Sequence, residues 1–231
     1  MKIKLSRLKK NILGETLWVK RKVKCRAQWV GNDYGGFYIN PELLNNTSIV
    51  YSIGIGEDTS FDEAMMQQFG CKVFAFDPTP KSIKYVEHKK LGSLFHFTPW
   101  GIGAKTETTT FYLPQNESNV SGSIVIQKNV SETKAIDVQL KHINDLTTHF
   151  NHSHIDVLKL DIEGAEYQVL PTLFESGIQF DQLLLEFHER LFPNGKEMTK
   201  NMIDLASQYG YELFAYSPTQ EEVSFIRKEL C

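Results

Sequence analysis

The stretch from Ser48 to Pro78 constrains the fold more than any other part of this 231-residue chain. Its first apolar run, Ile49 to Ile53, is too short to form a helix, and Gly54 and Gly56 interrupt it. We therefore expect a buried strand that enters a tight glycine turn.

A helix and a second strand are expected to follow this turn. Thr59 or Ser60 can cap the helix, and Gly70 can end it. The apolar run Val73 to Phe76 then predicts a strand, which ends at Asp77. The order strand, helix, strand is that of a nucleotide-binding βαβ unit.

The position of Asp77, about twenty residues after the glycines, indicates a nucleoside cofactor, because a carboxylate there can accept both hydrogen bonds of a ribose. The glycine pattern leaves the cofactor open. It is an incomplete dinucleotide fingerprint, with Thr59 in place of the third glycine, or an incomplete methyl-donor pattern, with Ser52 in place of an acid. A glycine pair alone favours an ordinary strand-to-helix turn, but the ordered strand, helix and strand together with Asp77 reverse that preference.

Length and composition predict one α/β domain with an N-terminal extension, since 41% of the residues are hydrophobic. The three cysteines, Cys25, Cys71 and Cys231, lack the paired spacing of a disulfide framework or a zinc site, so we expect a reducing compartment. No segment approaches the roughly 18 apolar residues that span a bilayer, and the start lacks the apolar core of a signal peptide. A soluble, cytoplasmic protein is the expectation.

The N-terminal segment is strongly basic although the chain carries a net charge of -3. Within residues 1–26 only Glu15 is acidic, and the basic residues are Lys2, Lys4, Arg7, Lys9, Lys10, Lys20, Arg21, Lys22, Lys24 and Arg26. This asymmetry favours either peripheral contact with a membrane or another polyanion, or a solvated leader that packs on an acidic body. No segment resembles a nucleic-acid-binding module, so no specific nucleic-acid partner is expected.

Two aromatic and glycine-rich segments are candidate ligand contacts. Tyr34 to Phe37 can form a flap that carries rings to a ligand, or a plain hairpin turn. Trp100 follows the strand predicted at Leu94–Phe97, where its ring can stack on an adenine or belong to the core.

The second informative stretch is Ile155 to Glu166, an apolar strand that ends in Asp161 and Glu163. Carboxyl ends of strands in open α/β sheets bind ligands, and buried acids are costly unless they bind something. The next strand, Leu183–Glu186, delivers Glu186 and His188 to the same edge. These four side chains can act as a general base, a clamp for an acceptor hydroxyl or a divalent-ion site. The alternative is a salt-bridged rim with Lys159 and Arg190, which applies above all to Glu166 and Glu189, whereas a functional role is preferred for Asp161 and Glu163.

The remaining elements complete one sheet. Strands are expected at Thr106–Leu113, Ser123–Gln127 and Ala135–Leu140, a polar loop at Pro114–Gly122, helices at Ser82–Lys90, Tyr167–Phe174 and Glu197–Tyr209, and a terminal hairpin at Glu212–Tyr216 and Val223–Arg227. A connection this short requires the last strand to be antiparallel.

Three segments together resemble the FkbM-type S-adenosylmethionine-dependent methyltransferases. They are Val50–Asp62, Phe69–Thr79 and the most specific of them, Leu158-Lys-Leu-Asp-Ile-Glu-Gly-Ala-Glu166. The resemblance runs from about Tyr34 to the end, which gives a basic extension at 1–33 and a methyltransferase domain at 34–231. It implies the class I methyltransferase fold, a Rossmann-like α/β fold whose seven-stranded sheet is mostly parallel with the last strand antiparallel, and with helices on both faces.

The resemblance also implies S-adenosylmethionine as cofactor and residue roles as follows. The cofactor-binding residues would be Ser52, Ile53, Gly54, Gly56, Glu57, Asp77, Pro78, Trp100, Gly101 and Asp161. Independently of the resemblance, the acids at the strand ends lead to the hypothesis that Asp161, Glu163 and His188 are catalytic and that Asp161, Glu186 and His188 hold a metal such as Mg²⁺. The expected reaction is O-methylation of a small molecule or glycan, with a sugar hydroxyl as first acceptor. The alternatives are an NAD-dependent oxidoreductase and a non-catalytic cofactor-binding module.

Overall fold

A seven-stranded sheet forms the centre of the computed structural model, which describes residues 17–114 and 130–231. Across the sheet the strands are β11 (Tyr211–Tyr216), β12 (Glu222–Arg227), β10 (Gln179–Glu186), β9 (His154–Leu160), β3 (Ile49–Ile53), β4 (Lys72–Phe76) and β5 (Phe95–Thr98). Only β12 runs antiparallel to its neighbours within this sheet. The class I methyltransferase sheet predicted from the sequence is confirmed.

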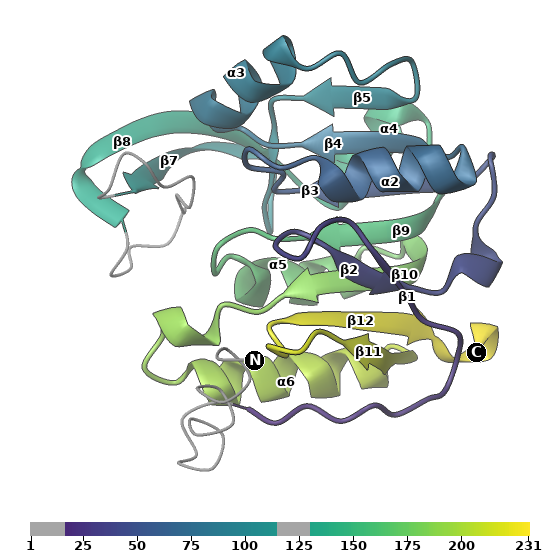
Figure 1. The fold of residues 1–231 in the computed structure, drawn as a ribbon. Helices are drawn as coiled ribbons and strands as arrows, with labels where there is room; N and C mark the ends of the chain where they lie inside the picture. Colours follow the sequence, from purple (N-terminus) through teal and green to yellow (C-terminus); the bar gives the residue numbers. More distant parts are fainter. Residues whose placement is uncertain (1–16, 115–129) are drawn as a thin grey trace.

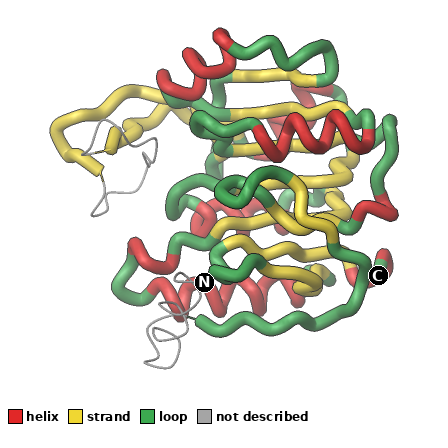
Figure 2. The backbone as a smooth tube through the Cα atoms, in the orientation of Figure 1, coloured by secondary structure: helices red, strands yellow, loops and turns green. Residues whose placement is uncertain are grey.

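Helices cover both faces of the sheet (Figures 1 and 2). One face carries α2 (Ser60–Phe69) together with a hairpin of β1 (Gln28–Val30) and β2 (Phe37–Ile39), and the other carries α4 (Ile143–Phe150), α5 (Glu166–Glu175) and α6 (Gly195–Gln208). The remaining helical elements are α3 (Pro80–His88), η1 (Pro41–Leu43), η2 (Glu189–Leu191) and η3 (Lys228–Leu230).

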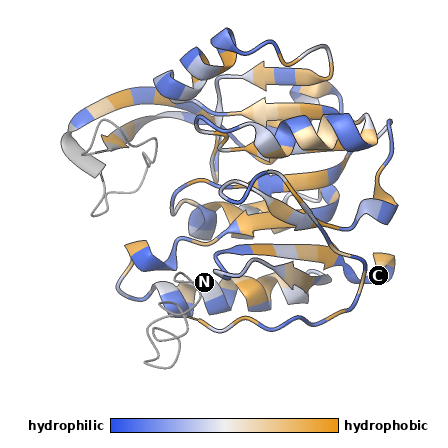
Figure 3. Cartoon of the chain, viewed as in Figure 1, coloured by the Kyte–Doolittle hydropathy of each residue, from blue (hydrophilic) through white to orange (hydrophobic). Residues whose placement is uncertain are grey.

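Alternation along the strands assigns side chains to the two faces, because successive residues of a strand point in opposite directions. Val50 packs in the cluster with α2 and the hairpin, whereas Tyr51 packs in the cluster with α4 and α5. Both faces are apolar, and the central strands are accordingly orange along most of their length in Figure 3. This explains why these strands appear in the sequence as nearly continuous apolar runs.

The ends of α2 follow the prediction in one respect and differ in another. Gly70 adopts the left-handed conformation at φ 68° and its amide donates to Met66 O, as a C-cap glycine does. At the other end the Thr59 hydroxyl donates to Glu63 instead of capping, and Asp58 Oδ1 accepts from the amide of Ser60 at 2.8 Å. Asp58 therefore supplies the side-chain cap expected from Thr59 or Ser60.

A second sheet extends from the carboxyl edge of the first as an arm (Figure 1). It contains β6 (Gly101–Ile102), β7 (Glu107–Pro114) and β8 (Val130–Lys141). The strands expected at Thr106–Leu113 and Ala135–Leu140 are thus confirmed as β7 and β8. The polar loop after Pro114 and the strand predicted at Ser123–Gln127 fall outside the described residues.

The segment before the hairpin packs along the main sheet. The amide of Lys22 donates to Leu213 O at 2.7 Å, and the amide of buried Val19 donates to Gln220 Oε1 at 3.1 Å. The predicted division at residues 33 and 34 stays a prediction, and five of the ten basic residues of this segment precede the described residues. Among the helices described, none combines the length and the apolar character needed to cross a membrane.

The cysteine prediction is wrong in one respect, because Cys25 and Cys231 form a disulfide across a sequence separation of 206 residues. Only Cys71 is free, and it is buried. Sequence spacing could not reveal this pair, since the fold alone brings the two ends together. Disulfides persist mainly in oxidising compartments, so this bond does not fit the reducing compartment expected from the spacing.

Candidate active site

A cavity of about 920 Å³ opens at the carboxyl ends of the parallel strands. It lies beside β3 and β9, where the strand order reverses, which is where open α/β sheets bind ligands. Its lining comes from the glycine turn, the ends of β4, β9 and β10, the arm, and the tip of the β1–β2 hairpin. The chain thus brings its two informative segments to one cavity.

Gly54 allows the glycine turn to lie against the strand end that carries the acids. Its φ is 78°, and a Cβ at this position would lie 1.7 Å from the carbonyl oxygen of Asp161. Asp161 N in turn donates to Ile53 O at 3.0 Å. No other residue fits this contact, because any side chain would collide with the backbone.

Asp77 is buried and holds the glycine turn by hydrogen bonds. Its Oδ2 accepts from the amides of Ile55 and Gly56 at 3.1 and 3.0 Å, and its Oδ1 accepts from the amide and hydroxyl of Thr79 at 2.9 and 2.7 Å. Since a carboxylate offers about four acceptor positions, a ribose would share these oxygens with the protein. The ribose contact stays a prediction, and the role that the structure displays is to hold the turn.

Lys159 is a site residue that the sequence did not single out. It is 5% exposed, lines the cavity, and donates from Nζ to Gly54 O at 3.0 Å. Burial raises the pKa of neighbouring Asp62 to about 6, although the Lys159 charge opposes that rise. The sequence pattern suggests only a salt-bridged rim for Lys159. Alternation along its strand does not show which face of the sheet the glycine turn approaches.

His188 lies beneath the cavity floor among four carboxylates. Its Nδ1 is 2.8 Å from Glu166 Oε1, and its Nε2 is 3.4 Å from Glu163 Oε2, 3.5 Å from Glu186 Oε1 and 3.7 Å from Asp161 Oδ1. His188 and Glu166 are fully buried. The convergence predicted for Asp161, Glu163, Glu186 and His188 is therefore present, and Glu166 joins them instead of lying on the rim.

The charges of this cluster shift its titration. Burial disfavours the imidazolium of His188, but the carboxylates of Glu166, Asp161 and Glu163 outweigh burial and raise its pKa to about 10. Burial and the Asp161 charge raise the pKa of Glu186 to about 9. A protonated His188 or Glu186 cannot accept a proton, so Asp161 and Glu163 are the stronger candidates for a general base.

Glu163 has an unusual backbone for a residue with a side chain, at φ 50°. Left-handed conformations of this kind cost free energy and cluster at functional sites. Here the turn of Glu163 directs its carboxylate toward the imidazole of His188.

The tip of the β1–β2 hairpin borders the same cavity. Asn32 Nδ2 donates to Asp58 Oδ2 at 2.7 Å, and its Oδ1 accepts from the amides of Tyr34 and Gly35. Tyr34 is 78% exposed, and partial burial with the charges of Asp161 and Glu186 raises its pKa. The segment is a hairpin turn, as one of the two sequence interpretations required, and it places an aromatic ring at the acid side of the cavity.

Most of the chain matches a known methyltransferase family. Residues 45–213 match the model of the methyltransferase FkbM domain, which covers more than half of the chain. The chain belongs to the FkbM methyltransferase family. This membership supports S-adenosylmethionine as the cofactor and sets aside the nicotinamide alternative.

Relatives of this FkbM domain include two mammalian proteins. The chain is 28% identical over 154 residues to human probable methyltransferase-like protein 24, across 66% of this chain and 36% of that protein. The rat protein of the same name is 28% identical over 141 residues, across 60% and 32%. The chain spans about a third of the length of the curated relatives that it matches.

Solved structures with similar backbones include two archaeal fibrillarins. The Methanococcus jannaschii protein gives a TM-score of 0.45 at 10% identity, covering 91% of this chain and 86% of its own. Aeropyrum pernix fibrillarin, solved with S-adenosyl-L-methionine, gives 0.44 at 10% identity, covering 79% and 66%. The fold assignment rests on the strand order of the sheet described above.

Most residues predicted for the FkbM cofactor site line the cavity, but Ser52 and Trp100 do not. Those that line it are Ile53, Gly54, Gly56, Glu57, Asp77, Pro78, Gly101 and Asp161. Ser52 is fully buried within β3. Trp100 packs edge-on against His149 of α4, with a ring separation of 4.9 Å, and Lys141 Nζ lies 5.0 Å from the centre of its ring.

Proposed function

We propose that this FkbM domain transfers the methyl group of S-adenosylmethionine to a hydroxyl oxygen, and that a sugar or glycan supplies this hydroxyl. The observation that carries the proposal is the contact between the glycine turn and the acid-bearing strand end. Gly54 and Asp161 touch through their backbones, and both line one cavity. A cofactor on the turn therefore lies beside the acids.

The acids suit a hydroxyl acceptor, because a hydroxyl must lose its proton when its oxygen takes a methyl group. Asp161 and Glu163 both line the cavity, and their carboxylates can accept that proton or hold the hydroxyl. A neutral thioether leaves as S-adenosylhomocysteine, so the positive charge of the donor disappears as the C–O bond forms. Much of the rate in such a transfer comes from alignment of the two reactants.

A sugar acceptor is supported by the chemistry of the cavity wall. Several carboxylates converge there, and carboxylates accept hydrogen bonds from neighbouring hydroxyls. Tyr34 presents an exposed ring at the same side, on which the apolar face of a sugar can pack. Contact of the basic N-terminal segment with a polyanion remains a separate prediction.

Methyl transfer is tested with S-adenosylmethionine carrying a ¹³C-labelled methyl group and a panel of sugar glycosides. Two-dimensional NMR then identifies the atom that carries the label. A methyl group on a sugar oxygen supports the proposal, and label on nitrogen or sulfur in a broader acceptor panel contradicts it. Tight cofactor binding without transfer to any acceptor would favour a non-catalytic binding module.

Glu163→Gln is the variant that tests the proton acceptor. We expect its turnover to fall by about 10²-fold or more while S-adenosylhomocysteine binds as in the wild type. Glu175→Gln, at the exposed end of α5, is the matched control and should turn over normally. Full turnover of Glu163→Gln would assign the proton to another group.

A further inference from the structure

The imidazole of His188 has two chemically different sides. On the Nδ1 side, Glu166 Oε1 lies 2.8 Å away and also accepts from the amide of Ile162 at 3.2 Å. An ionised carboxylate can only accept, so Nδ1 carries a hydrogen and the lone pair of a neutral ring is on Nε2. Glu166 therefore orients the ring with Nε2 toward the cavity floor.

On the Nε2 side, the described residues offer no hydrogen-bond partner to this fully buried nitrogen. The three carboxylate oxygens in front of it are 3.4 to 3.7 Å away. These separations are longer than the 2.7–3.2 Å typical of N–H···O hydrogen bonds. The nitrogen points into a group of acids without making a normal hydrogen bond to any of them.

The charge around Nε2 is predominantly negative. Asp161, Glu163 and Glu186 all face it, and Arg190 approaches this group only at 4.0 Å from Glu186. The three acidic side chains are 19 to 29% exposed, so water screens them incompletely. A positive species between these atoms offsets their repulsion. In the metal-free site the proton on His188 Nε2 does this, and a divalent ion would take the place of that proton.

We infer that Asp161, Glu186 and His188 bind one divalent metal ion, with His188 Nε2 as its nitrogen ligand. One ligand atom from each lies within 4.8 Å of the other two. Two ligand atoms of a first-row ion, each about 2.1 Å from the metal, lie roughly 3.0–3.5 Å apart. The separations of Nε2 from Glu186 and Asp161, 3.5 and 3.7 Å, are close to this value.

Glu166 is the positioning residue of this site. Ligating histidines usually donate their second ring N–H to a carboxylate, which fixes the ring and strengthens the metal bond. Glu166 makes this contact from the first turn of α5.

The donor set favours Mn²⁺ over the Mg²⁺ expected from the sequence. Two carboxylates suit hard ions, but an imidazole nitrogen suits transition metals. Asp161 and Glu186 line the cavity, so the remaining coordination positions face the acceptor. The inference deepens the proposed function, because the ion would hold the acceptor oxygen and leave Glu163 to take the proton.

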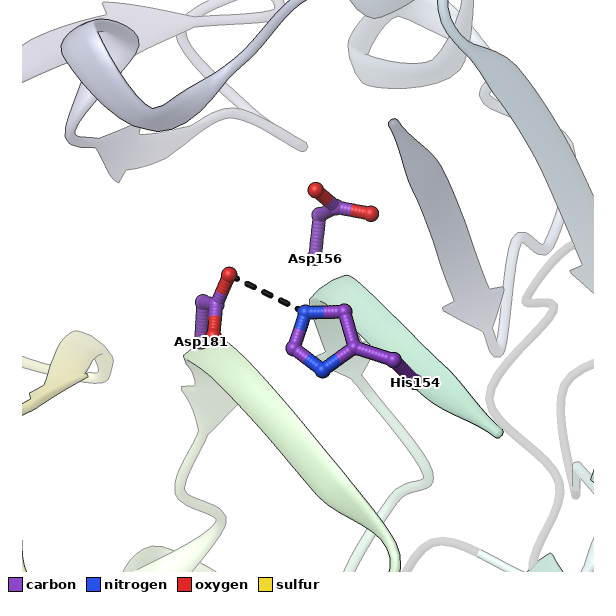
Figure 4. Close-up of side chains that lie close together, drawn as sticks. All are labelled: His154, Asp156 and Asp181. Carbon is purple, nitrogen blue, oxygen red and sulfur yellow. Dashed lines mark hydrogen bonds and ion pairs between the residues drawn. The ribbon is translucent and has the colours of Figure 1, made fainter. Parts of the chain in front are cut away.

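A second cluster, at the opposite end of β9 and β10, provides a comparison within the same chain. It contains His154, Asp156 and Asp181 (Figure 4). There His154 Nε2 is 3.1 Å from Asp181, Asp156 accepts from the amide of Ile49, and Arg227 lies 3.8 Å from Asp181. Each group of this second cluster already has a partner, so none of its atoms is left for a metal ion in the way that His188 Nε2 is.

The test is titration of metal-stripped protein with Mn²⁺, followed by electron paramagnetic resonance and without cofactor or acceptor. We expect one saturable site per chain and a ¹⁴N coupling from a histidine ligand in the pulsed spectrum. Asp161→Asn should weaken binding at least tenfold and Glu166→Gln about 10–100-fold. Asp181→Asn should bind as the wild type does.

The result separates the metal site from the methyl transfer. Absence of saturable binding, binding without ¹⁴N coupling, or loss of binding in Asp181→Asn in place of Asp161→Asn overturns the inference. The spectrum of the wild-type protein alone shows whether the metal binds through a histidine. The test therefore holds even if a variant fails to fold. Methyl transfer at the full rate in excess chelator would overturn the role of the ion in holding the acceptor and leave the proposed function intact.

Discussion

The carboxylate of Asp77 accepts a 3.0 Å hydrogen bond from the backbone amide of Gly56, which ties the end of β4 to the turn after β3. The amide of Ile55 donates to the same oxygen. Preformed turns of this kind present backbone groups to a ligand without further ordering. The shape of the cofactor side of the cavity therefore depends on one carboxylate.

Replacing Asp77 with alanine should weaken cofactor binding without a large loss of helix or sheet. The change leaves two buried amides without their acceptor, which costs about 1–3 kcal/mol. If the turn loses its bound conformation as a result, the same free energy is lost from cofactor binding. Affinity for S-adenosylhomocysteine, measured by calorimetry, then falls about 10–100-fold. Glu87→Ala, at an exposed position of α3, is the control, and equal affinities for the two variants would contradict this role.

Gly54→Ala should be far more damaging than a glycine change at an open position. Both Gly54 and Gly92 have positive φ, but the new methyl group meets the Asp161 backbone at 1.7 Å in one case and nothing within 4 Å in the other. We expect Gly92→Ala to cost about 1–2 kcal/mol in urea unfolding and Gly54→Ala at least about 2 kcal/mol more. Similar costs would show that the turn can move away from Asp161.

Asp62 predicts a pH dependence of stability. Burial raises its pKa from 3.8 to about 6 in the folded state, so between these values the folded chain retains a proton that the unfolded chain has lost. Stability contributed by this group is present at low pH and falls as pH rises from about 4 to 6, by about 3 kcal/mol in total.

Asp62→Asn removes this contribution. The difference in unfolding free energy between the variant and the wild type should therefore rise as pH increases from about 4 to 6. Above that range this difference should stay constant. Chemical unfolding at several pH values measures the difference, in which other titrating groups cancel. Parallel curves for the two proteins would contradict the raised pKa.

The disulfide between Cys25 and Cys231 predicts sensitivity to reductant. It closes a loop of almost the entire chain, and loss of such a crosslink typically costs about 2–5 kcal/mol. The urea midpoint should fall when dithiothreitol is added, and Cys25→Ser should show the lower midpoint with no response to dithiothreitol. Three reactive thiols in the unfolded, unreduced protein, in place of one, would show that the bond is absent.

Local sequence signals predicted the elements that form the first half of the site. The unit from β3 to β4 contains the glycines that end its elements. Gly54 and Gly70 both adopt positive φ, at the positions where the sequence pattern predicts a turn and the end of a helix. The antiparallel β12 followed from loop length alone. Helix α4 was missed because it has only eight residues, too few for its amphipathic pattern to be recognised from the sequence alone.

The parts that sequence could not supply depend on contacts between distant segments. The approach of Lys159 to Gly54 joins residues 105 apart, and that of Glu166 to His188 depends on the relative placement of α5 and β10. Trp100 was placed at the cavity because it follows a strand, yet its ring turns toward α4. Ser52 occupies the position of an expected ligand, but strand alternation directs it into the core.

The most direct measurement is calorimetric titration of the purified chain with S-adenosylhomocysteine, with NAD titrated in parallel. The account predicts micromolar binding of S-adenosylhomocysteine, about 8 kcal/mol, and no binding of NAD. Binding of NAD alone would contradict it, because the glycine turn and Asp77 would then hold a dinucleotide and the neighbouring acids would require a different reaction.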